Sequence, residues 1–136
     1  MEKTFELEII ASDRVFYTGP CESLVFPGID GAQGVWANHE RTVTCVSAGE
    51  LKYKVDDQWN YAAISDGYAE ITGDHVVLIA DTVERPEEID IKRAEEAKAR
   101  AEEKMRQKQS IMEYYHTQVA LNKAMNRLKV NQKHFK

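Results

Sequence analysis

The hydrophobic and polar positions follow two different periods, one before and one after residues 83–94. In the first part of the chain, short runs such as residues 5–10 and 42–46 either alternate apolar with polar side chains or are rich in β-branched residues. Both patterns are typical of β-strands that are buried on one face. Because turn residues separate many such runs at regular intervals, the sequence predicts an antiparallel sandwich or barrel.

Two short segments in this part are expected to form hairpin turns. Residues 56–58 and residues 72–74 each join two strand-like runs, and both predict a β-hairpin. Residues 28–34 contain three glycines and are expected to form a loop.

The second part of the chain contains no glycine or proline after Pro86, and small or apolar residues recur there at steps of three and four. Asp90 is expected to cap the first helix, because its carboxylate can accept hydrogen bonds from free backbone N–H groups. The sequence Ser110-Ile-Met-Glu is a capping box that predicts a second helix. The predicted fold is therefore β + α, with an N-terminal antiparallel β-sandwich (residues 1–85) followed by a C-terminal two-helix antiparallel hairpin (residues 86–136).

The apolar stripes of the two predicted helices are narrow. The first contains Ile91, Ala94, Lys98, Ala101, Met105 and Lys108, and the second contains Ile111, Tyr114, Leu121, Met125 and Leu128. Alanine buries little area, and isolated helices of this length are marginally stable in water. The hairpin can therefore be closed on itself, docked on the sandwich or opened as an arm, and a permanently packed hairpin is an equally good interpretation.

Charge is divided unevenly between the two parts. Residues 1–85 contain 6 Lys/Arg and 15 Asp/Glu, a net of −9, whereas residues 86–136 contain 12 and 8, a net of +4. From Ser110 onward there are 5 basic residues and a single acid. This basic end suggests an acidic partner, although a solvated helix face that balances the acidic first part explains it as well.

The two cysteines and the hydropathy pattern indicate a chain that works in a reducing compartment without a membrane span. Cys21 and Cys45 lie in strand-like runs without metal-site spacing, so both are expected to be buried as small apolar residues. The longest aliphatic run is residues 76–80, too short to cross a membrane, and the sequence has no signal-peptide pattern. Any membrane association is therefore expected to go through a partner.

None of the common catalytic motifs is present in the sequence. It has no phosphate-binding P-loop, no GxSxG, no HExxH and no Cys/His cluster spaced for a metal ion, so we predict no catalytic residues and no metal site. Only the basic helix faces offer ligand chemistry. Arg93 and Arg100 share one face of the first helix, and Lys123 and Arg127 share one face of the second. If the helices fold together, these four cations are expected to converge on a polyphosphate.

Six stretches, spread in order over the whole chain, carry a resemblance to a known family. They are residues 26–35, 47–51, 65–70, 76–85, 89–94 and 126–130. With these stretches the chain resembles the epsilon subunit of bacterial and chloroplast-type F-type ATP synthases, which is called delta in mitochondria. The resemblance implies a β-sandwich followed by two helices, in agreement with the fold predicted from the patterns.

The resemblance implies a non-catalytic rotor subunit in the central stalk of a proton- or sodium-translocating synthase. Such a subunit couples the c-ring and gamma to the catalytic head, and its C-terminal helices inhibit ATP hydrolysis. The implied partners are gamma, the c-ring and an acidic segment of the beta subunit. The chain is then a peripheral membrane protein at the cytoplasmic face of the bacterial plasma membrane, held there only through the complex.

The resemblance also implies that the chain binds ATP as a regulatory ligand and requires no cofactor. In some relatives a motif of the form I/L-D-x-x-R-A binds ATP in the folded hairpin, and this chain matches the motif in full. The implied ATP-binding residues are Glu84, Ile89, Asp90, Arg93, Ala94, Arg100, Lys123 and Arg127. Lys123 stands where such binders favour arginine, which keeps the charge but loses the bidentate fork. A helix cap with ordinary salt bridges explains Asp90 and Arg93 equally well.

Two contact surfaces are also implied by the resemblance. The c-ring and gamma contact loop contains Asp30, Gly31, Ala32, Trp36 and His39. The contact with the acidic beta segment involves Lys123, Arg127, Lys129 and Lys133. Relatives carry Pro-Gly-His-Ala-Pro where this chain has Ala-Asn-His-Glu-Arg at residues 37–41, so the loop loses both prolines, and Asn38 is expected to adopt the positive φ of the missing glycine.

Two other functions compete with the rotor subunit. In the first, the hairpin is mainly an ATP sensor. In the second, which sets the resemblance aside, the basic helix of a free-standing sandwich binds nucleic acid. The sequence lacks the interleaved aromatic and basic residues of single-strand binders, and the sandwich is acidic, so we expect no nucleic-acid partner.

Overall fold

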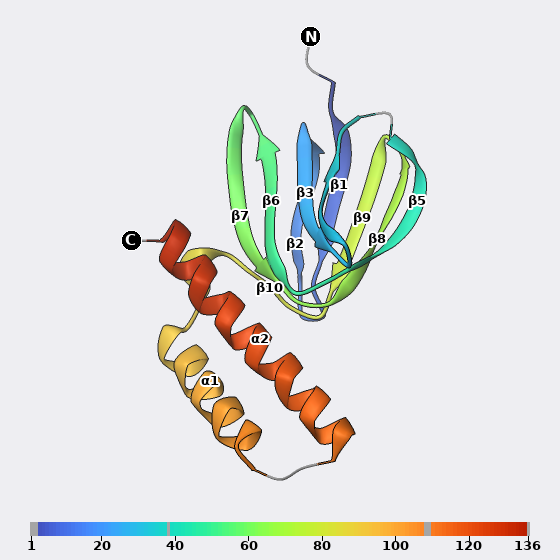
Figure 1. The fold of residues 1–136 in the computed structure, drawn as a ribbon. Coiled ribbons are helices and arrows are strands. Elements are labelled where there is room, and N and C mark those ends of the chain that lie inside the picture. Colours follow the sequence, from blue (N-terminus) through green and yellow to red (C-terminus); the bar gives the residue numbers. More distant parts are fainter. Residues whose placement is uncertain (1–2, 38, 108–109, 136) are drawn as a thin grey trace. The chain divides into compact units, whose positions relative to one another are not determined.

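The computed structural model describes residues 3–37, 39–107 and 110–135. The chain folds into two compact units, Met1–Glu84 and Arg85–Lys136 (Figure 1). The first unit contains the strands and the second the helices.

The first unit is built from two five-stranded sheets. Sheet A has the strand order β2-β1-β9-β8-β5, and sheet B has the order β10-β7-β6-β3-β4. The strands are β1 (Phe5–Ile10), β2 (Val15–Cys21), β3 (Ser23–Gly28), β4 (Gly31–Val35), β5 (His39–Val46), β6 (Gly49–Val55), β7 (Gln58–Ile64), β8 (Gly67–Gly73), β9 (His75–Ala80) and β10 (Val83–Glu84). This arrangement confirms the predicted sandwich.

One strand pair departs from the antiparallel prediction. Strand β1 runs parallel to β9, with Leu7 opposite Val76 and Ile9 opposite Leu78. The other described pairs are antiparallel. A hydrophobic pattern reports which face of a strand is buried but carries no information on strand direction, so the sequence could not reveal this pair.

The core lies between the two sheets and contains only residues of the first unit. Alternate residues of β1, such as Leu7 and Ile9, are fully buried, as are Leu24 and Phe26 of β3. Because successive side chains of a strand point to opposite faces, this burial fixes the register of each strand.

The predicted hairpin turns at residues 56–58 and 72–74 are present. Asp56 and Asp57 have φ angles of 51° and 62°, as a two-residue type I′ turn requires. In the second turn Gly73 takes a φ of 57°. The loop expected at residues 28–34 is wrong, because Gly28 pairs with Gly31 and the chain continues as edge strand β4. Glycine weakens a strand but does not prevent pairing at an edge.

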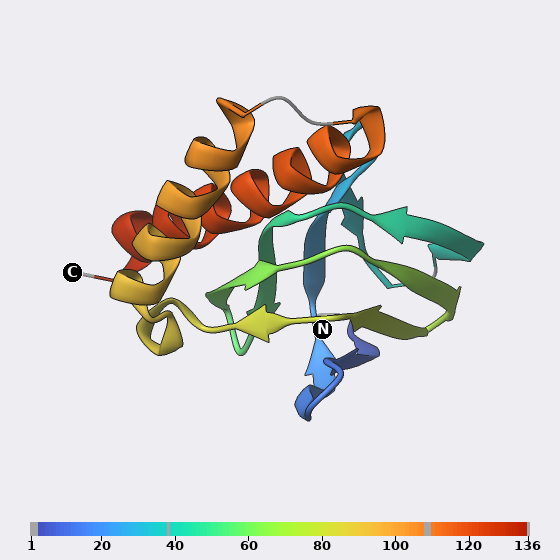
Figure 2. The same ribbon diagram turned by 90° about the horizontal axis from the view of Figure 1, so that it is seen from below.

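The second unit consists of a 3-10 turn, η1 (Pro86–Glu88), and two helices, α1 (Ile91–Met105) and α2 (Ile111–His134). Both predicted caps are present. Asp90 accepts a hydrogen bond from the Arg93 backbone N–H, and the Ser110 hydroxyl accepts one from the Glu113 backbone N–H. The helices lie side by side as a hairpin in both views (Figures 1 and 2).

The buried seam of the hairpin matches the predicted stripes only in part. On α1, Ala94 and Ala101 are buried, as expected, but Ile91 is 40% exposed, and Lys108 lies outside the described residues. On α2, the predicted Ile111, Tyr114 and Met125 are 91%, 45% and 47% exposed. The α2 residues that are buried or half-buried include Thr117, Leu121, Ala124, Leu128 and Asn131. The α2 seam thus combines the predicted Leu121 and Leu128 with small and polar residues, which allow two helix backbones to approach closely.

The two cysteines differ in exposure. Cys21 is buried and donates its S–H to the carbonyl oxygen of Ser23, and burial raises the pKa of the Cys21 thiol. Cys45 is exposed, so the expectation that both are buried is wrong for it. It lies on the outer face of β5, one residue before the buried Val46.

A buried hydrogen bond closes the open end of the hairpin. The Asn131 side-chain amide, 4% exposed, donates to the carbonyl oxygen of Pro86 at 3.0 Å. Val130 and Ile89 are buried in the same unit. This contact ties the last turns of α2 to η1, 45 residues away in the sequence, so it stabilises the closed hairpin.

Because every residue of the sandwich core lies before Arg85, we predict that residues 1–84 fold on their own. A fragment ending at Glu84 keeps every member of the sandwich core, including Val83 on β10, so it is expected to show a cooperative thermal transition. Circular dichroism of the fragment and the full chain makes the comparison. A fragment without strand signal or without a transition would mean that the sandwich depends on the helical unit.

Replacing Asn131 with alanine should destabilise the hairpin. The substitution removes the buried side-chain hydrogen bond, and the Pro86 carbonyl oxygen keeps the bond from the Ile89 backbone N–H at 3.4 Å. Loss of one such bond costs about 0.5–1.5 kcal/mol. Amide hydrogen exchange in α1 and α2 should accelerate accordingly, while exchange in the sandwich stays unchanged. Gln132→Ala, at the exposed neighbouring position, is the control. Equal exchange rates in the two variants would contradict the role of Asn131.

Candidate functional site

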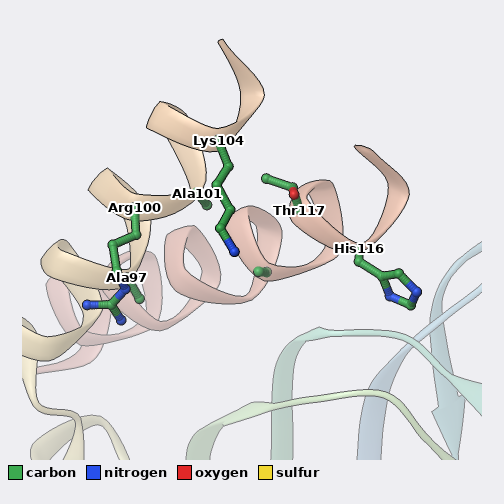
Figure 3. Close-up of a pocket in the computed structure, with 7 residues that line it drawn as sticks. Ala97, Arg100, Ala101, Lys104, His116 and Thr117 are labelled. Atoms are coloured by element: carbon green, nitrogen blue, oxygen red, sulfur yellow. The ribbon is translucent and has the colours of Figure 1, made fainter. Parts of the chain in front are cut away.

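An open hollow of about 250 Å³ lies between the two helices of the hairpin. Its floor contains small side chains, Ala101 from α1 and Thr117 from α2 among them. Figure 3 shows Lys104 extending from α1 towards α2 and Thr117 pointing back towards it, whereas the ring of His116 points away from Lys104 and Arg100. Arg100 lines the same hollow from α1. The hollow is therefore bordered by basic side chains from both helices.

These basic side chains belong to two helical rows. On α1, residues 93, 97, 100 and 104 are spaced by three or four, and on α2 residues 116, 120, 123 and 127 are spaced in the same way. Residues at this spacing lie on one face of a helix. Since both rows contribute to the hollow, their basic members share one side of the hairpin, which we call the basic face. Its members are Arg93, Arg100, Lys104, His116, Lys123 and Arg127.

The part of the basic face around the hollow is electrostatically unfavourable by itself. Arg100 and Lys104 are like charges four residues apart, an arrangement that destabilises a helix by about 0.2–0.5 kcal/mol. In the described part of the chain, neither has a carboxylate within 4.0 Å. By contrast, Arg85 and Arg106 form ion pairs with nearby glutamates at 3.1 and 2.9 Å.

Three of the predicted ATP-binding residues have structural roles. Asp90 Oδ1 accepts from the Arg93 backbone N–H at 3.0 Å, so its carboxylate caps α1. Ile89 and Ala94 are 6% and 0% exposed. These two side chains therefore contribute to packing of the helical unit.

The remaining predicted ATP-binding residues are divided between the units. Arg93, Arg100, Lys123 and Arg127 share the basic face, with the two α2 residues half-buried. Glu84 belongs to the sandwich unit, where it pairs with Ala63 at the edge of sheet B.

The four residues predicted to contact an acidic segment do not form one strip. Lys123 and Arg127 lie on the basic face, four residues apart. Lys129 and Lys133 are exposed and also four residues apart, but an α-helix turns by about 100° per residue, so they lie on a different side of α2.

The predicted contact loop is likewise divided. Asp30 lies in the turn between β3 and β4, and Gly31 and Ala32 begin β4. Trp36 follows the other end of β4, about 13 Å along the chain from Ala32. It is 61% exposed and its ring covers Gly34, where an added Cβ would lie 2.9 Å from the indole.

Two parts of the contact-loop prediction fall on residues that the structure describes only partly or not at all. His39 begins β5, and its side chain lies outside the described part of the structure, as does the whole of Asn38.

The outer face of sheet A carries an apolar surface that the sequence analysis did not identify. Ile10, Ile79, Tyr68 and Cys45 stand opposite one another on four adjacent strands, and we call them the apolar row. Tyr68 is 48% exposed and the two isoleucines are half-buried. One signal was present in the sequence: the unbroken apolar run at residues 76–80 indicates a strand whose two faces are both apolar.

Acidic side chains border this apolar row. The next register on the same face places Glu8 and Glu70 on either side of Val77, with Val43 beside Glu70 on β5. An open hollow of about 410 Å³ adjoins the row itself, and Asp66 and Asp81 are among the residues that line it. The outer face of sheet A is therefore apolar in its middle and negative at its borders.

The described residues contain no group of three or more His, Cys, Asp or Glu that could hold a metal ion. None of the helices described is long and apolar enough to cross a membrane.

Comparison with solved structures finds the same fold in two mitochondrial assemblies. A chain from the Euglena gracilis mitochondrial ATP synthase, in a structure of OSCP/F1/c-ring, matches with a TM-score of 0.79 at 22% identity, covering 95% of this chain and 81% of that one. A chain from the central stalk/c-ring of the Tetrahymena thermophila mitochondrial ATP synthase matches with a TM-score of 0.71 at 8% identity, covering 96% and 98%. At these identities the likeness concerns the fold alone.

Sequence comparison identifies the family. The model of the ATP synthase Delta/Epsilon chain beta-sandwich domain matches residues 4–86, and that of the long alpha-helix domain matches residues 87–132. The ATP synthase epsilon chain of Ruminiclostridium cellulolyticum is 46% identical over 125 residues, covering 92% of this chain and 93% of the relative. That of Caldanaerobacter subterraneus subsp. tengcongensis is 43% identical over 135 residues, covering 98% of each. The chain therefore belongs to the ATP synthase delta/epsilon chain family, whose members are non-catalytic subunits of the ATP synthase.

Proposed function

We propose that this chain is the central-stalk rotor subunit that joins gamma and the c-ring of an F-type ATP synthase. The observation that carries this proposal is the apolar row on sheet A, with its acidic borders. Burial of exposed apolar area favours association. The borders favour a partner that surrounds its apolar contact with basic residues. We assign this surface to gamma.

The c-ring contact is assigned to the two ends of β4. Asp30, Gly31 and Ala32 form one end, and Trp36 and His39 lie at or beyond the other. Strand β4 is an edge strand with small side chains and offers unpaired backbone groups, while the exposed Trp36 adds an apolar anchor. Through these contacts the chain is held at the cytoplasmic face of the bacterial plasma membrane. It serves a synthase coupled to protons or sodium ions.

The helical unit is the regulatory part of this proposal. Its alanine-rich seam buries little area, so opening of the hairpin costs little free energy. An opened α2 presents two basic patches, Lys123 with Arg127 and Lys129 with Lys133, to the acidic segment of the beta subunit. Such contacts hold the rotor and inhibit ATP hydrolysis.

Reconstitution with a synthase that lacks this subunit tests both roles. The full chain should restore ATP synthesis driven by an ion gradient. A chain that ends before Ile89 should restore synthesis to a similar rate but leave a higher rate of ATP hydrolysis, because the inhibitory helices are missing. Failure of the full chain to support synthesis would refute the coupling role, and equal hydrolysis rates with both chains would refute inhibition by the helices.

A second candidate function is ATP sensing by the closed hairpin. The basic face supports it, because Arg93, Arg100, Lys123 and Arg127 lie on one side of the two helices and can approach a triphosphate together. Glu84, Ile89, Asp90 and Ala94 complete the residue set implied by the resemblance to the family. In this function ATP stabilises the closed hairpin and releases the inhibition.

Calorimetric titration of the full chain with ATP tests this second function. Lys123→Arg should tighten binding by about 1–2 kcal/mol, because a guanidinium can hold a phosphate with two hydrogen bonds. Arg93→Ala should abolish binding without unfolding the sandwich. The absence of heat from the wild-type chain and both variants at millimolar ATP would show that residues 89–94 serve only as a helix cap.

A further inference from the structure

The first half of α2 carries a contiguous apolar surface that the hairpin does not cover. Its members are 91%, 68%, 66% and 37% exposed, in the order Ile111, Met112, Tyr115 and Val119. Because these residues are spaced by three or four, they form one surface, which we call the apolar stripe. Tyr115 precedes the buried Thr117 by two residues, about 200° around the helix, so the stripe lies opposite the seam with α1. A contiguous exposed group of this kind indicates an interaction surface.

Charge distinguishes between the surfaces that could cover the stripe. A second α2 is disfavoured, because the chain from Ser110 onward contains 5 basic residues and a single acid, and two such helices repel each other. The apolar row of sheet A has the opposite character, since Glu70 lies in the next register and Asp66 lines the adjoining hollow. The two parts of the chain also carry opposite net charges, −9 and +4. The stripe therefore complements the apolar row.

The two surfaces also agree in size. From Met112 to Val119 the stripe extends about 11 Å along α2. The apolar row crosses four adjacent strands, a distance of about 14 Å. The hollow of about 410 Å³ beside the row has room for one large side chain. Tyr115 suits it, because its ring is apolar and its hydroxyl can donate to a carboxylate such as that of Asp66.

We propose that the apolar stripe of one free subunit docks on the apolar row of a second copy of this chain. Within one chain, Glu84 is the last residue paired in sheet B and Arg85 already caps η1, so no linker residue separates the two units. A second copy is not restricted by this tether. The stripe therefore finds its partner on another molecule.

This contact and the contact with gamma exclude each other, because both use the apolar row. The free subunit covers its exposed apolar surface with a second copy until gamma displaces that copy. The inference concerns the free chain and does not rest on the proposed rotor function. An experiment without any other subunit therefore tests it separately.

Met112 offers a matched pair of variants. Its side chain is 68% exposed, so a substitution there leaves the seam undisturbed. Met112→Glu places a negative charge opposite the acidic borders of the row, whereas Met112→Lys places a positive charge at the same position, and both residues are good helix formers. Gln132→Glu adds the same negative charge at an exposed position near the other end of α2 and is the control.

Sedimentation equilibrium of the full chain at physiological ionic strength measures the association. The mean mass of the wild-type chain should rise with concentration above the 15.6 kDa of one chain. Met112→Glu and Tyr68→Glu should raise the Kd of association about tenfold or more, Met112→Lys should raise it less, and Gln132→Glu should keep it within about twofold. A mean mass of one chain at all concentrations, or equal Kd values for the two Met112 variants, would overturn the proposal.

A mixture of two variants identifies the surfaces that pair. The ¹⁵N-labelled Met112→Glu chain keeps its apolar row, and the unlabelled Tyr68→Glu chain keeps its apolar stripe. Adding the second to the first should shift NMR signals of amides around the row on β1, β5, β8 and β9, but not those of residues 111–119. Exchange of the labels should give the reverse. Shifts of residues 111–119 in both mixtures, or shifts in neither, would overturn the proposal.

Discussion

Burial of the inward-facing side chains between the two sheets determines the strand register of the sandwich. Leu7, Leu24, Phe26 and Leu78 are fully buried, and a shift of any strand by one residue would turn such side chains to the outside. The same register therefore determines the outer faces. It aligns the apolar row of sheet A across four strands and places acidic residues in the next register. The core thus fixes the surface that we assign to gamma.

The helical unit is held by much weaker contacts than the sandwich. Its seam contains Ala94, Ala101 and Ala124, which bury little area. The Asn131–Pro86 hydrogen bond compensates in part for this small buried area, because it joins the end of α2 to η1. A unit of this kind can respond to a ligand or a partner, because a few kilocalories per mole suffice to shift its equilibrium. The stable sandwich is thereby joined to a helical unit whose state can change.

The periodicities were sufficient to predict the sandwich, the hairpin and both helix caps, since each depends on local sequence. They were insufficient where packing between distant segments determines which strands pair and which side chains are buried. The parallel pairing of β1 with β9 joins distant segments, and the seam of α2 selects Thr117 and Asn131 over Ile111 and Tyr114 because small or hydrogen-bonded side chains fit between the helices. For the candidate sites, spacing placed Arg93 and Arg100 on one face but did not identify Lys104 or His116, because a hollow depends on both helices.

If the outer face of sheet A engages the rotor of an ATP synthase, the tagged full chain should retain rotor subunits when it is purified from membranes. Identification of the bound subunits should recover gamma and the c-ring subunit with the wild-type chain. Tyr68→Glu, which places a charge in the middle of the apolar row, should lose most of the gamma while the sandwich remains folded. Recovery of neither gamma nor the c-ring subunit with the wild-type chain, or of equal gamma with both chains, would show that this face does not engage the rotor.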